Sequence, residues 1–180
     1  LVTYHPPTLG TESVEVQFQT LLDVLSEQQD TKIIFTFPNA DTDGRIIISL
    51  INQFVEQNGE RAIVFSSMGY RLYLSTMRLV DGVVGNSSSG LTEAPSLFTG
   101  TINIGDRQRG RLKAESVIDC EPIKKSINDA IQKLYSTEFQ DKLHTVNNPY
   151  GSRGASEAIV NILESVSLDG ILKKTFYDYE

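Results

Sequence analysis

Three consecutive hydroxyl side chains, Ser87, Ser88 and Ser89, follow a short apolar run and a glycine. If the apolar run is a strand and the serines open a helix, the turn between them exposes free main-chain N–H groups at the positive end of the helix dipole. Together with the hydroxyls, these groups suit an anion, and a phosphate fits them without a lysine. The alternative is an ordinary serine N-cap whose other hydroxyls face solvent. The pattern alone supports both interpretations equally.

An arginine cluster is the second candidate for binding chemistry. Arg107, Arg109 and Arg111 follow another apolar run in a chain that is acidic overall. The planar guanidinium donates two parallel hydrogen bonds and is the side chain best matched to phosphate. Arg107 is nearest to the predicted strand end, so we expect it to serve the site. Arg109 and Arg111 are more simply explained as a solvated basic loop that pairs with nearby carboxylates.

The histidines and the cysteine give weaker signals. His5 precedes Pro6-Pro7, and a following proline favours extended backbone, so its ring is expected at a strand exit. It is either a site residue or a turn residue without chemistry. His144 lies in a polar stretch at a helix end and is expected on the surface. Cys120 has no activating neighbour in sequence and is expected to be a buried small side chain.

Composition argues against several classes of function. The net charge of −7 disfavours nucleic acid and anionic membrane surfaces as partners. A single cysteine excludes an intrachain disulfide, and with only two histidines no metal site is expected; this cysteine usage fits the cytoplasm. No apolar run is long enough to span a bilayer. The Walker A loop, the complete dinucleotide fingerprint and the nucleophile elbow are absent too.

The elements that would position these residues alternate along the chain. Short apolar runs predict strands, and a 3.6-residue apolar spacing predicts helices between them. The predicted strands are residues 1–4, 32–37, 62–66, 82–84, 101–104 and 116–118. The predicted helices are 12–28 with Thr11 as its N-cap, 47–58, 70–79, one that opens within 87–90 and carries Glu93, 123–134, and 155–166 with Gly154 and Glu157 in capping-box spacing.

This alternation predicts the fold class. Short strands joined by helices require right-handed crossovers and a parallel sheet covered on both faces. We therefore predict an α/β fold, a Rossmann-like doubly wound parallel sheet. Ligands of such sheets bind outside the carboxyl ends of the strands, where Ser87 and Arg107 fall. No repeat or charge block suggests an internal boundary, so one domain over residues 1–180 is expected, and it would bind a phosphorylated small molecule.

Six short motifs occur in order along the chain. They are Thr3-Tyr4-His5-Pro6, Pro38-Asn39-Ala40-Asp41, Gly85-Asn86-Ser87-Ser88-Ser89-Gly90 with Glu93, Ile102-Asn103-Ile104-Gly105-Asp106-Arg107-Gln108-Arg109-Gly110-Arg111, Ser116-Val117-Ile118-Asp119-Cys120 and Asn148-Pro149-Tyr150-Gly151. Each is weak alone, but six in order are specific. Together they resemble the UDP-N-acetylglucosamine 2-epimerases, especially the hydrolysing branch that supplies sialic-acid-type sugar synthesis. The resemblance runs from the first residue to about Phe176.

The resemblance implies an architecture. The family has two Rossmann-type domains in the glycosyltransferase-B fold, with the active site in the cleft between them. The match covers the carboxyl-terminal half, so residues 1–180 are expected to be a nucleotide-sugar-binding domain. The amino-terminal Rossmann half is then a missing partner. A homo-oligomer is expected at full length, and no cofactor is expected.

Four residues are expected at the diphosphate of UDP because they match the family's motifs. Ser87 and Ser88 would contact the diphosphate, and Arg107 would support the phosphates from the following loop. His5 is similar to the family histidine that approaches the diphosphate, and it is the candidate catalytic residue. These implied contacts agree with the anion site that the serine turn predicts.

Two further segments are expected to hold the nucleoside. Glu93 is similar to the family residue that holds the ribose hydroxyls. The stretch Ser67-Met68-Gly69-Tyr70 resembles the segment that reads uracil largely with main-chain groups. Met68 is therefore a candidate substrate-binding residue.

The resemblance also implies a reaction. In that family UDP leaves the sugar by elimination, water adds to the glycal-like intermediate, and N-acetylmannosamine and UDP are released. The implied substrate is UDP-N-acetylglucosamine or its diacetamido-dideoxy relative. The carboxylates thought to handle the C2 proton lie in the amino-terminal domain. Three alternatives stay open: a non-hydrolysing epimerase, a glycosyltransferase of the same fold, and a non-catalytic nucleotide-sugar-binding module.

The chain departs from the family pattern at two places. Thr99-Gly100-Thr101 stands where the family commonly has Gly-Thr-Pro, a change that concerns packing. Ser152-Arg153 stands where an Asp-Gly pair commonly follows the Asn-Pro-Tyr-Gly motif. The second departure concerns contacts with the sugar or at the hinge.

Overall fold

The computed structural model describes residues 1–7, 13–40, 43–151 and 154–173. The chain forms two compact units, Leu1–Tyr150 and Gly151–Glu180. Sequence patterns alone indicated no internal boundary, whereas the structure places one after Tyr150. The first unit carries the sheet and all of the candidate site residues. The described part of the second unit carries one helix, α7 Ala155–Ser165.

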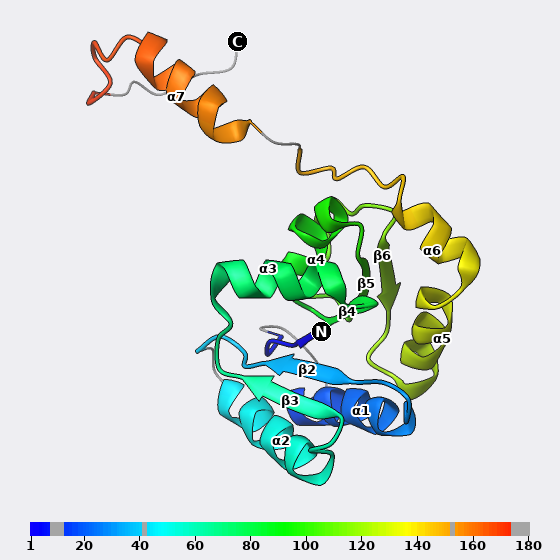
Figure 1. Cartoon of the computed structure of the whole chain (residues 1–180). Coiled ribbons are helices and arrows are strands. Elements are labelled where there is room, and N and C mark those ends of the chain that lie inside the picture. The colour runs from blue at the N-terminus through cyan, green and yellow to red at the C-terminus, as the bar shows by residue number, and fades with distance from the viewer. Residues whose placement is uncertain (8–12, 41–42, 152–153, 174–180) are drawn as a thin grey trace. The chain divides into compact units, whose positions relative to one another are not determined.

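A six-stranded parallel sheet forms the centre of the first unit (Figure 1). Its strands are β1 Val2–Thr3, β2 Ile33–Thr36, β3 Ala62–Phe65, β4 Gly82–Gly85, β5 Gly100–Ile104 and β6 Val117–Cys120. Their order, β3-β2-β1-β4-β5-β6, is that of the Rossmann fold, and it reverses between β1 and β4. The predicted α/β fold is confirmed, with each strand within two residues of its expected bounds.

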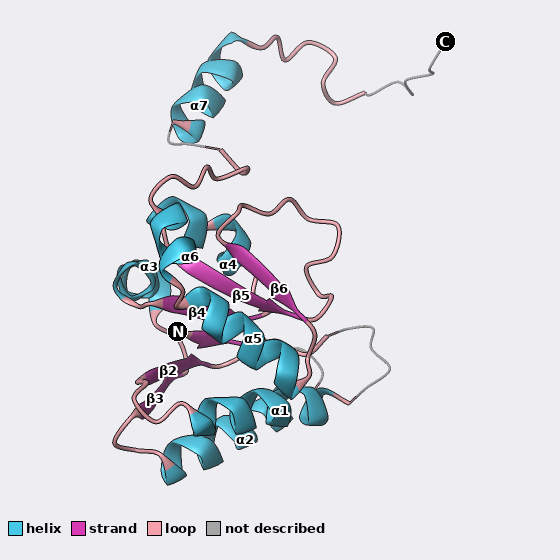
Figure 2. Cartoon of the chain, turned by 90° about the vertical axis from the view of Figure 1, so that its right-hand side faces the viewer, coloured by secondary structure: helices cyan, strands magenta, loops and turns pink. Residues whose placement is uncertain are grey.

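Helices cover both faces of this sheet (Figure 1 and Figure 2). They are α1 Val14–Glu27, α2 Gly44–Gln57, α3 Gly69–Leu79, α4 Ser89–Thr92, the 3₁₀ helix η1 Ala94–Leu97, α5 Lys124–Leu134 and α6 Thr137–Leu143. The larger apolar core lies under α1, α2 and α5, and the smaller one under α3 and η1. Along β4, Val84 belongs to the first core and Val83 to the second, because successive side chains of a strand point to opposite faces.

Helix α1 illustrates how local sequence fixes an element. Ser13 is its N-cap, and the Ser13 Oγ accepts a hydrogen bond from the Val16 N–H at 3.2 Å. The predicted apolar stripe, including Phe18 and Leu21, is buried against the sheet. The predicted N-cap, Thr11, lies outside the described residues.

The segment after the serines departs most from its prediction. One helix carrying Glu93 was expected, but α4 ends at Thr92 and η1 follows it with Pro95 in its first turn. Proline has no N–H and its ring clashes with the preceding turn, so an α-helix does not continue through it. The β4–α4 turn is therefore followed by one short turn of helix rather than by a long one.

Helix α6 was not predicted as a separate element. Ser136 caps it, and the Ser136 Oγ accepts a hydrogen bond from the Phe139 N–H at 3.3 Å. Phe139 and Leu143 are buried in the larger core. Seven residues are too few for a periodic pattern to stand out from the preceding helix. His144 ends α6 and is exposed, as predicted.

Helix α7 lies in the second unit. Its predicted capping box is wrong, because the N-cap Gly154 has no side chain to accept a bond and adopts φ +104. Of the predicted range 155–166, residues 155–165 form the helix and Val166 is its C-cap. Large apolar residues such as Ile162 and Leu163 are exposed. Neither α7 nor any other helix in the described part of the chain is long and apolar enough to cross a membrane.

Candidate functional site

A pocket opens at the carboxyl edge of the sheet, near the point where the strand order reverses. It has a volume of about 490 Å³ and is lined by the ends of β1 and β2, by residues 66–70, and by parts of α3 and the β4–α4 turn. Three candidate residues line it together: His5, Met68 and Ser87. Ligands of sheets with this topology bind at the crevice where the order reverses. Residues far apart in sequence thus meet at one place.

The side chain of Asn86 joins the ends of the two central strands. Its Oδ1 accepts a hydrogen bond from the His5 N–H at 2.7 Å, and its Nδ2 donates to the His5 carbonyl oxygen at 2.8 Å. Gly85, with φ +137, permits this approach, since a Cβ there would overlap the Thr3 carbonyl oxygen. Asn86 is 1% exposed, so water does not compete for these bonds. We call this pair of bonds the Asn86 clamp.

The His5 ring is oriented by a main-chain group. Its Nδ1 accepts a hydrogen bond from the Asn39 N–H at 3.1 Å. Because Nδ1 is an acceptor, the neutral ring carries its proton on Nε2, an assignment that follows from the hydrogen-bond geometry. The residue is 6% exposed at the exit of β1, where it was predicted. His5 can therefore donate a hydrogen bond through Nε2 while Asn39 fixes the orientation of its ring.

Arg107 reaches the same turn from the loop after β5. Its Nη1 donates to the Asn86 carbonyl oxygen at 3.2 Å, and Gln108 Nε2 donates to the same oxygen at 2.7 Å. Arg107 is half-buried, whereas Arg109 and Arg111 are exposed, as expected for the solvated part of the cluster. Among the described residues, however, neither exposed arginine forms an ion pair with a carboxylate. The cluster therefore places one guanidinium beside the serine turn.

The three serines have different partners. Ser88 is the N-cap of α4, but its hydroxyl makes no capping bond, so the ordinary N-cap interpretation does not describe it. Ser89 Oγ donates to Ser87 Oγ at 3.0 Å. The dipole of α4 is small, because it has only four residues and the dipole sums over aligned peptide units. Any anion binding here depends on the hydroxyls and Arg107 more than on the helix.

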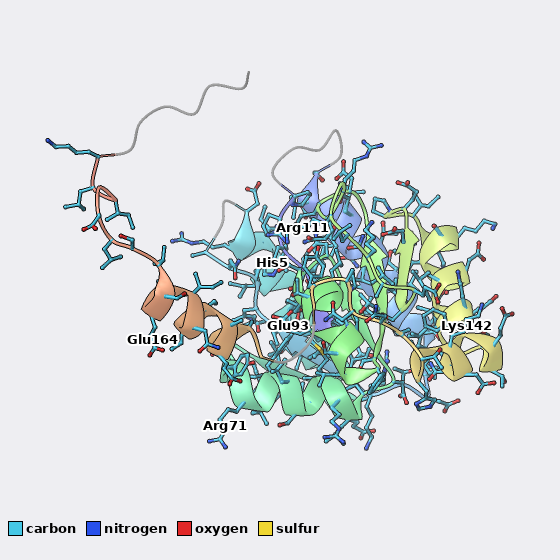
Figure 3. All side chains as sticks on the ribbon, turned by 90° about the horizontal axis from the view of Figure 1, so that it is seen from above. His5, Arg71, Glu93, Arg111, Lys142 and Glu164 are labelled. Atoms are coloured by element: carbon cyan, nitrogen blue, oxygen red, sulfur yellow. The ribbon has the colours of Figure 1, made fainter. Side chains whose placement is uncertain are left out.

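Glu93 lies at the far end of α4 from the serines. It is the C-cap of α4 and the N-cap of η1, which corrects the expectation that it sits in the first turns of a long helix. Its Oε2 accepts a hydrogen bond from the Thr92 hydroxyl, and the side chain is half-buried. Figure 3 labels Glu93 together with His5 in the first unit. The carboxylate does not line the pocket that holds His5.

Asn148, the first residue of the Asn-Pro-Tyr-Gly motif, makes a structural contact beside Glu93. Its Nδ2 donates to the Thr92 carbonyl oxygen at 2.8 Å and to Ser96 Oγ at 2.7 Å. These bonds fix the end of α4. The family-pattern departure at Ser152-Arg153 lies outside the described residues.

The other departure from the family pattern has a packing role. Thr99 Oγ1 donates to the Met77 carbonyl oxygen at 2.9 Å, near the end of α3. Thr101 Oγ1 donates to the Gly90 carbonyl oxygen at 2.9 Å, within α4. Both threonines are buried. Their hydroxyls thus link α3 and α4, which both contribute residues to the pocket, to β5 and to the residue that precedes it.

Three hydroxyl residues at the pocket were not predicted. Thr3 and Thr36 are register partners on β1 and β2, and their Oγ1 atoms lie 2.7 Å apart. The Tyr73 hydroxyl lies 3.3 Å from Thr3 Oγ1 and 2.8 Å from Ser89 Oγ. The threonines could have been found, because each falls within a predicted strand close to its carboxyl end. No local signal marks Tyr73.

A larger pocket, of about 660 Å³, lies at the opposite edge of the sheet, at the amino ends of β1 and β4. Leu1, Leu25 and Leu79 are in its lining, and none of the candidate residues is. The convergence of polar groups, and not size, therefore selects the pocket at the carboxyl edge. In the described part of the chain, no group of three or more His, Cys, Asp or Glu side chains could hold a metal ion.

The strand order and the polar pocket at its reversal define the first unit as a Rossmann-type α/β domain. Residues 1–164 match the family model described as UDP-N-acetylglucosamine 2-epimerase. The chain therefore belongs to the UDP-N-acetylglucosamine 2-epimerase family, and the resemblance found in the six motifs is confirmed.

Two curated relatives match nearly the whole chain but extend well beyond it. A GDP/UDP-N,N'-diacetylbacillosamine 2-epimerase (hydrolyzing) of Campylobacter jejuni is 38% identical over 182 residues, which are 99% of this chain and 46% of the relative. The polysialic acid biosynthesis protein P7 of Escherichia coli is 37% identical over 180 residues, with the same two shares. The chain thus spans about half the length of the curated relatives it matches.

Solved structures agree on the fold. A putative UDP-N-acetylglucosamine 2-epimerase of Listeria monocytogenes has a TM-score of 0.66 at 17% identity, over 97% of this chain and 45% of that one. The UDP-GlcNAc 2-epimerase of Neisseria meningitidis, solved with UDP-GlcNAc bound, has a TM-score of 0.63 at 15% identity, over 92% and 43% of the two chains. This chain corresponds to one half of such glycosyltransferase-B-like molecules.

Proposed function

We propose that this chain is the carboxyl-terminal, UDP-binding half of a cytoplasmic, hydrolysing UDP-sugar 2-epimerase. Its substrate would be UDP-N-acetylglucosamine or a diacetamido relative, and the products UDP and an N-acetylmannosamine-type sugar for sialic-acid-like sugar synthesis. Family membership and two relatives whose names include "(hydrolyzing)" support this proposal. The observation that carries it is the pocket that joins His5, Met68 and Ser87 at the strand reversal.

The proposed contacts follow the chemistry of each group. Ser87 and Ser88 donate hydroxyl hydrogen bonds to the diphosphate, and Arg107 supplies the positive charge beside them. Arg107 is already half-buried and oriented by the Asn86 carbonyl oxygen, so little side-chain freedom is lost when an anion binds. Met68, which lies within residues 66–70 of the pocket lining, contacts the uracil.

The proposed reaction places leaving-group chemistry in this half. A base removes the C2 proton, the C1–O bond to the diphosphate breaks with its electron pair going to UDP, and a C1–C2 double bond forms. Water then adds hydroxyl to C1 and a proton to C2, which releases the free epimerised sugar. A departing diphosphate gains negative charge, and fixed donors such as Arg107 and the His5 Nε2–H stabilise it. The base belongs to the amino-terminal half, and the full-length protein would be a homo-oligomer.

Calorimetry on the 180-residue chain tests the binding step. UDP should bind at least about tenfold more tightly than uridine, because hydrogen bonds to charged groups each contribute about 1.5–3 kcal/mol. Arg107→Ala should reduce this preference, and Arg109→Ala, which changes an exposed arginine of the same loop, should not. Equal binding of UDP and uridine by the wild-type chain would refute the proposed function.

A further inference from the structure

Five hydroxyl groups in the lining of the pocket form a continuous chain. They come from β2, β1, α3, α4 and the turn before α4, so they join four elements. In spatial order they are Thr36, Thr3, Tyr73, Ser89 and Ser87, with oxygen–oxygen distances of 2.7, 3.3, 2.8 and 3.0 Å. All five residues line the pocket. We call this set the hydroxyl chain.

The hydrogens of this chain must run in one direction. Each hydroxyl has a single hydrogen to donate. The geometry makes Ser89 the donor to Ser87, which uses the only hydroxyl hydrogen of Ser89. The bond between Ser89 and Tyr73 is then donated by Tyr73, and the bond between Tyr73 and Thr3 is donated by Thr3. By the same count, Thr36 donates to Thr3.

The consequence falls on Ser87. Its oxygen accepts from Ser89 Oγ and, at 3.4 Å, from the Ser89 N–H, so it serves as an acceptor within the protein. Its own hydrogen is not used by the hydroxyl chain, and no acceptor for it is recorded within the described residues. The Ser87 hydroxyl, the last of the hydroxyl chain, is thus available to donate to a ligand in the pocket. Successive hydrogen bonds that point the same way polarise one another, which strengthens the terminal donor.

We infer that Tyr73 is a positioning residue that orients the Ser87 hydroxyl as a donor to the diphosphate. This inference rests on the proposed function and adds how the protein keeps the Ser87 hydroxyl as a donor toward the diphosphate. A deprotonated diphosphate oxygen accepts hydrogen bonds and donates none, which matches a terminal hydroxyl that can only donate. Tyr73 is the central link: removing its hydroxyl leaves Ser89 free to turn and accept from Ser87.

Binding of UDP and uridine to the 180-residue chain, measured by calorimetry, tests the inference. Tyr73→Phe keeps the ring and removes only the hydroxyl. We expect it to lower the affinity for UDP about five- to tenfold, which corresponds to the loss of one or two neutral hydrogen bonds, while the affinity for uridine changes little. Tyr135→Phe, which removes a tyrosine hydroxyl at the exposed end of α5, is the matched control and should bind both ligands as wild type does.

A second variant shows whether the hydroxyls act as one chain. Ser89→Ala removes the hydroxyl between Tyr73 and Ser87 and should lower the affinity for UDP by a similar factor. In the double variant Tyr73→Phe/Ser89→Ala the two losses should not add, because either change alone already interrupts the chain. Additive losses, or an unchanged UDP-to-uridine ratio in both single variants, would overturn the inference. If the wild-type chain itself shows no preference for UDP, the proposed function fails, and the inference fails with it.

Discussion

At the scale of single residues, the pocket depends on hydrogen bonds that cross between strands. The Asn86 clamp fixes the main chain of His5, and the Asn39 N–H fixes its ring. The carbonyl oxygen of Asn86 in turn receives Arg107. One buried asparagine therefore positions both the candidate catalytic histidine and the candidate phosphate-binding arginine. Loss of Asn86 is expected to disturb both.

Glu93→Gln tests the contact with the ribose hydroxyls that the family resemblance implies for Glu93. A ribose presents two hydroxyl donors, and a carboxylate accepts from them more strongly than a neutral amide does. We expect the affinity of the chain for UDP to fall by about tenfold, corresponding to about 1.4 kcal/mol, while inorganic pyrophosphate binding changes little. Titration calorimetry with the two ligands measures the difference.

The matched control for this change is Glu56→Gln, on the exposed side of α2. It should leave both affinities at their wild-type values. A different outcome would change the assignment of Glu93. If the melting temperature drops sharply in Glu93→Gln and the affinities for both ligands fall together, the carboxylate mainly joins α4 to η1.

Cys120 gives a prediction that depends on pH. Burial, with the nearby Asp119 and Glu121 carboxylates, raises the pKa of its thiol from 9.0 to about 12. The folded protein thus disfavours the thiolate, whereas the unfolded chain ionises above about pH 9. The free energy of unfolding should therefore fall as pH rises from 9 to 11, and fall less in Cys120→Ala. Urea unfolding at both pH values tests this, and identical pH dependence of the two proteins would contradict it.

Residue types at strand ends were predictable, whereas their partners were not. Ser87 and Arg107 could be chosen because each follows an apolar run at an edge where ligands gather. The Asn86 clamp could not, because its partner His5 is 81 residues away in sequence. Tyr73 also escaped prediction, since nothing within its helix distinguishes a hydroxyl directed at another element. Side-chain hydrogen bonds between distant segments require the fold to be known first.

At the scale of elements, strands were predicted more reliably than helix lengths. Parallel strands are buried on both faces and therefore appear as continuous apolar runs. The helix α4 was expected to be longer than it is. It ends at Thr92 because Pro95 follows and because Asn148 binds the Thr92 carbonyl oxygen. The first cause is local and could have been weighed; the second comes from a loop more than fifty residues downstream.

Gly85→Ala tests the close contact between β1 and β4. The residue has φ +137, and a Cβ would overlap the Thr3 carbonyl oxygen. We expect the free energy of unfolding to fall by roughly 2–4 kcal/mol, from backbone strain and separation of the strands. Gly110→Ala is the control, since it also has positive φ, at +79, but has open space where the Cβ would be. Chemical unfolding of the two variants should separate the effect of crowding by the Cβ from the effect of positive φ alone. Equal losses of unfolding free energy in both variants would refute the crowding explanation.

At the scale of the whole molecule, the chain holds one wall of a proposed cleft. It spans 46% of the Campylobacter jejuni relative, yet it contains a Rossmann-type unit with its own core. The proposed reaction needs a leaving-group site and a base that reaches the C2 proton. Ser87, Ser88, Arg107 and His5 are all assigned to the leaving group. The proposal therefore divides the chemistry between two halves.

The 180-residue chain should accordingly bind UDP but not release it from UDP-N-acetylglucosamine. General base catalysis needs a group within hydrogen-bond reach of the proton, and water in an open site weakens the electrostatic stabilisation of the departing diphosphate. UDP release, followed by a coupled assay, should stay at the background rate. A protein that carries both halves is the positive control. Release by this chain at a comparable rate would mean that the catalytic base lies among these residues.

The Asn86 clamp also allows local opening at the pocket to be measured by hydrogen exchange of one amide, that of His5. The amide hydrogen of His5 is held by a side chain rather than by a neighbouring strand, so its exchange with deuterated solvent requires only that the clamp opens. The amide hydrogens of β4 and β5, in the middle of the sheet, exchange through larger openings that approach global unfolding. The difference in protection between His5 and these strands therefore measures the free energy of local opening at the candidate site separately from the stability of the fold.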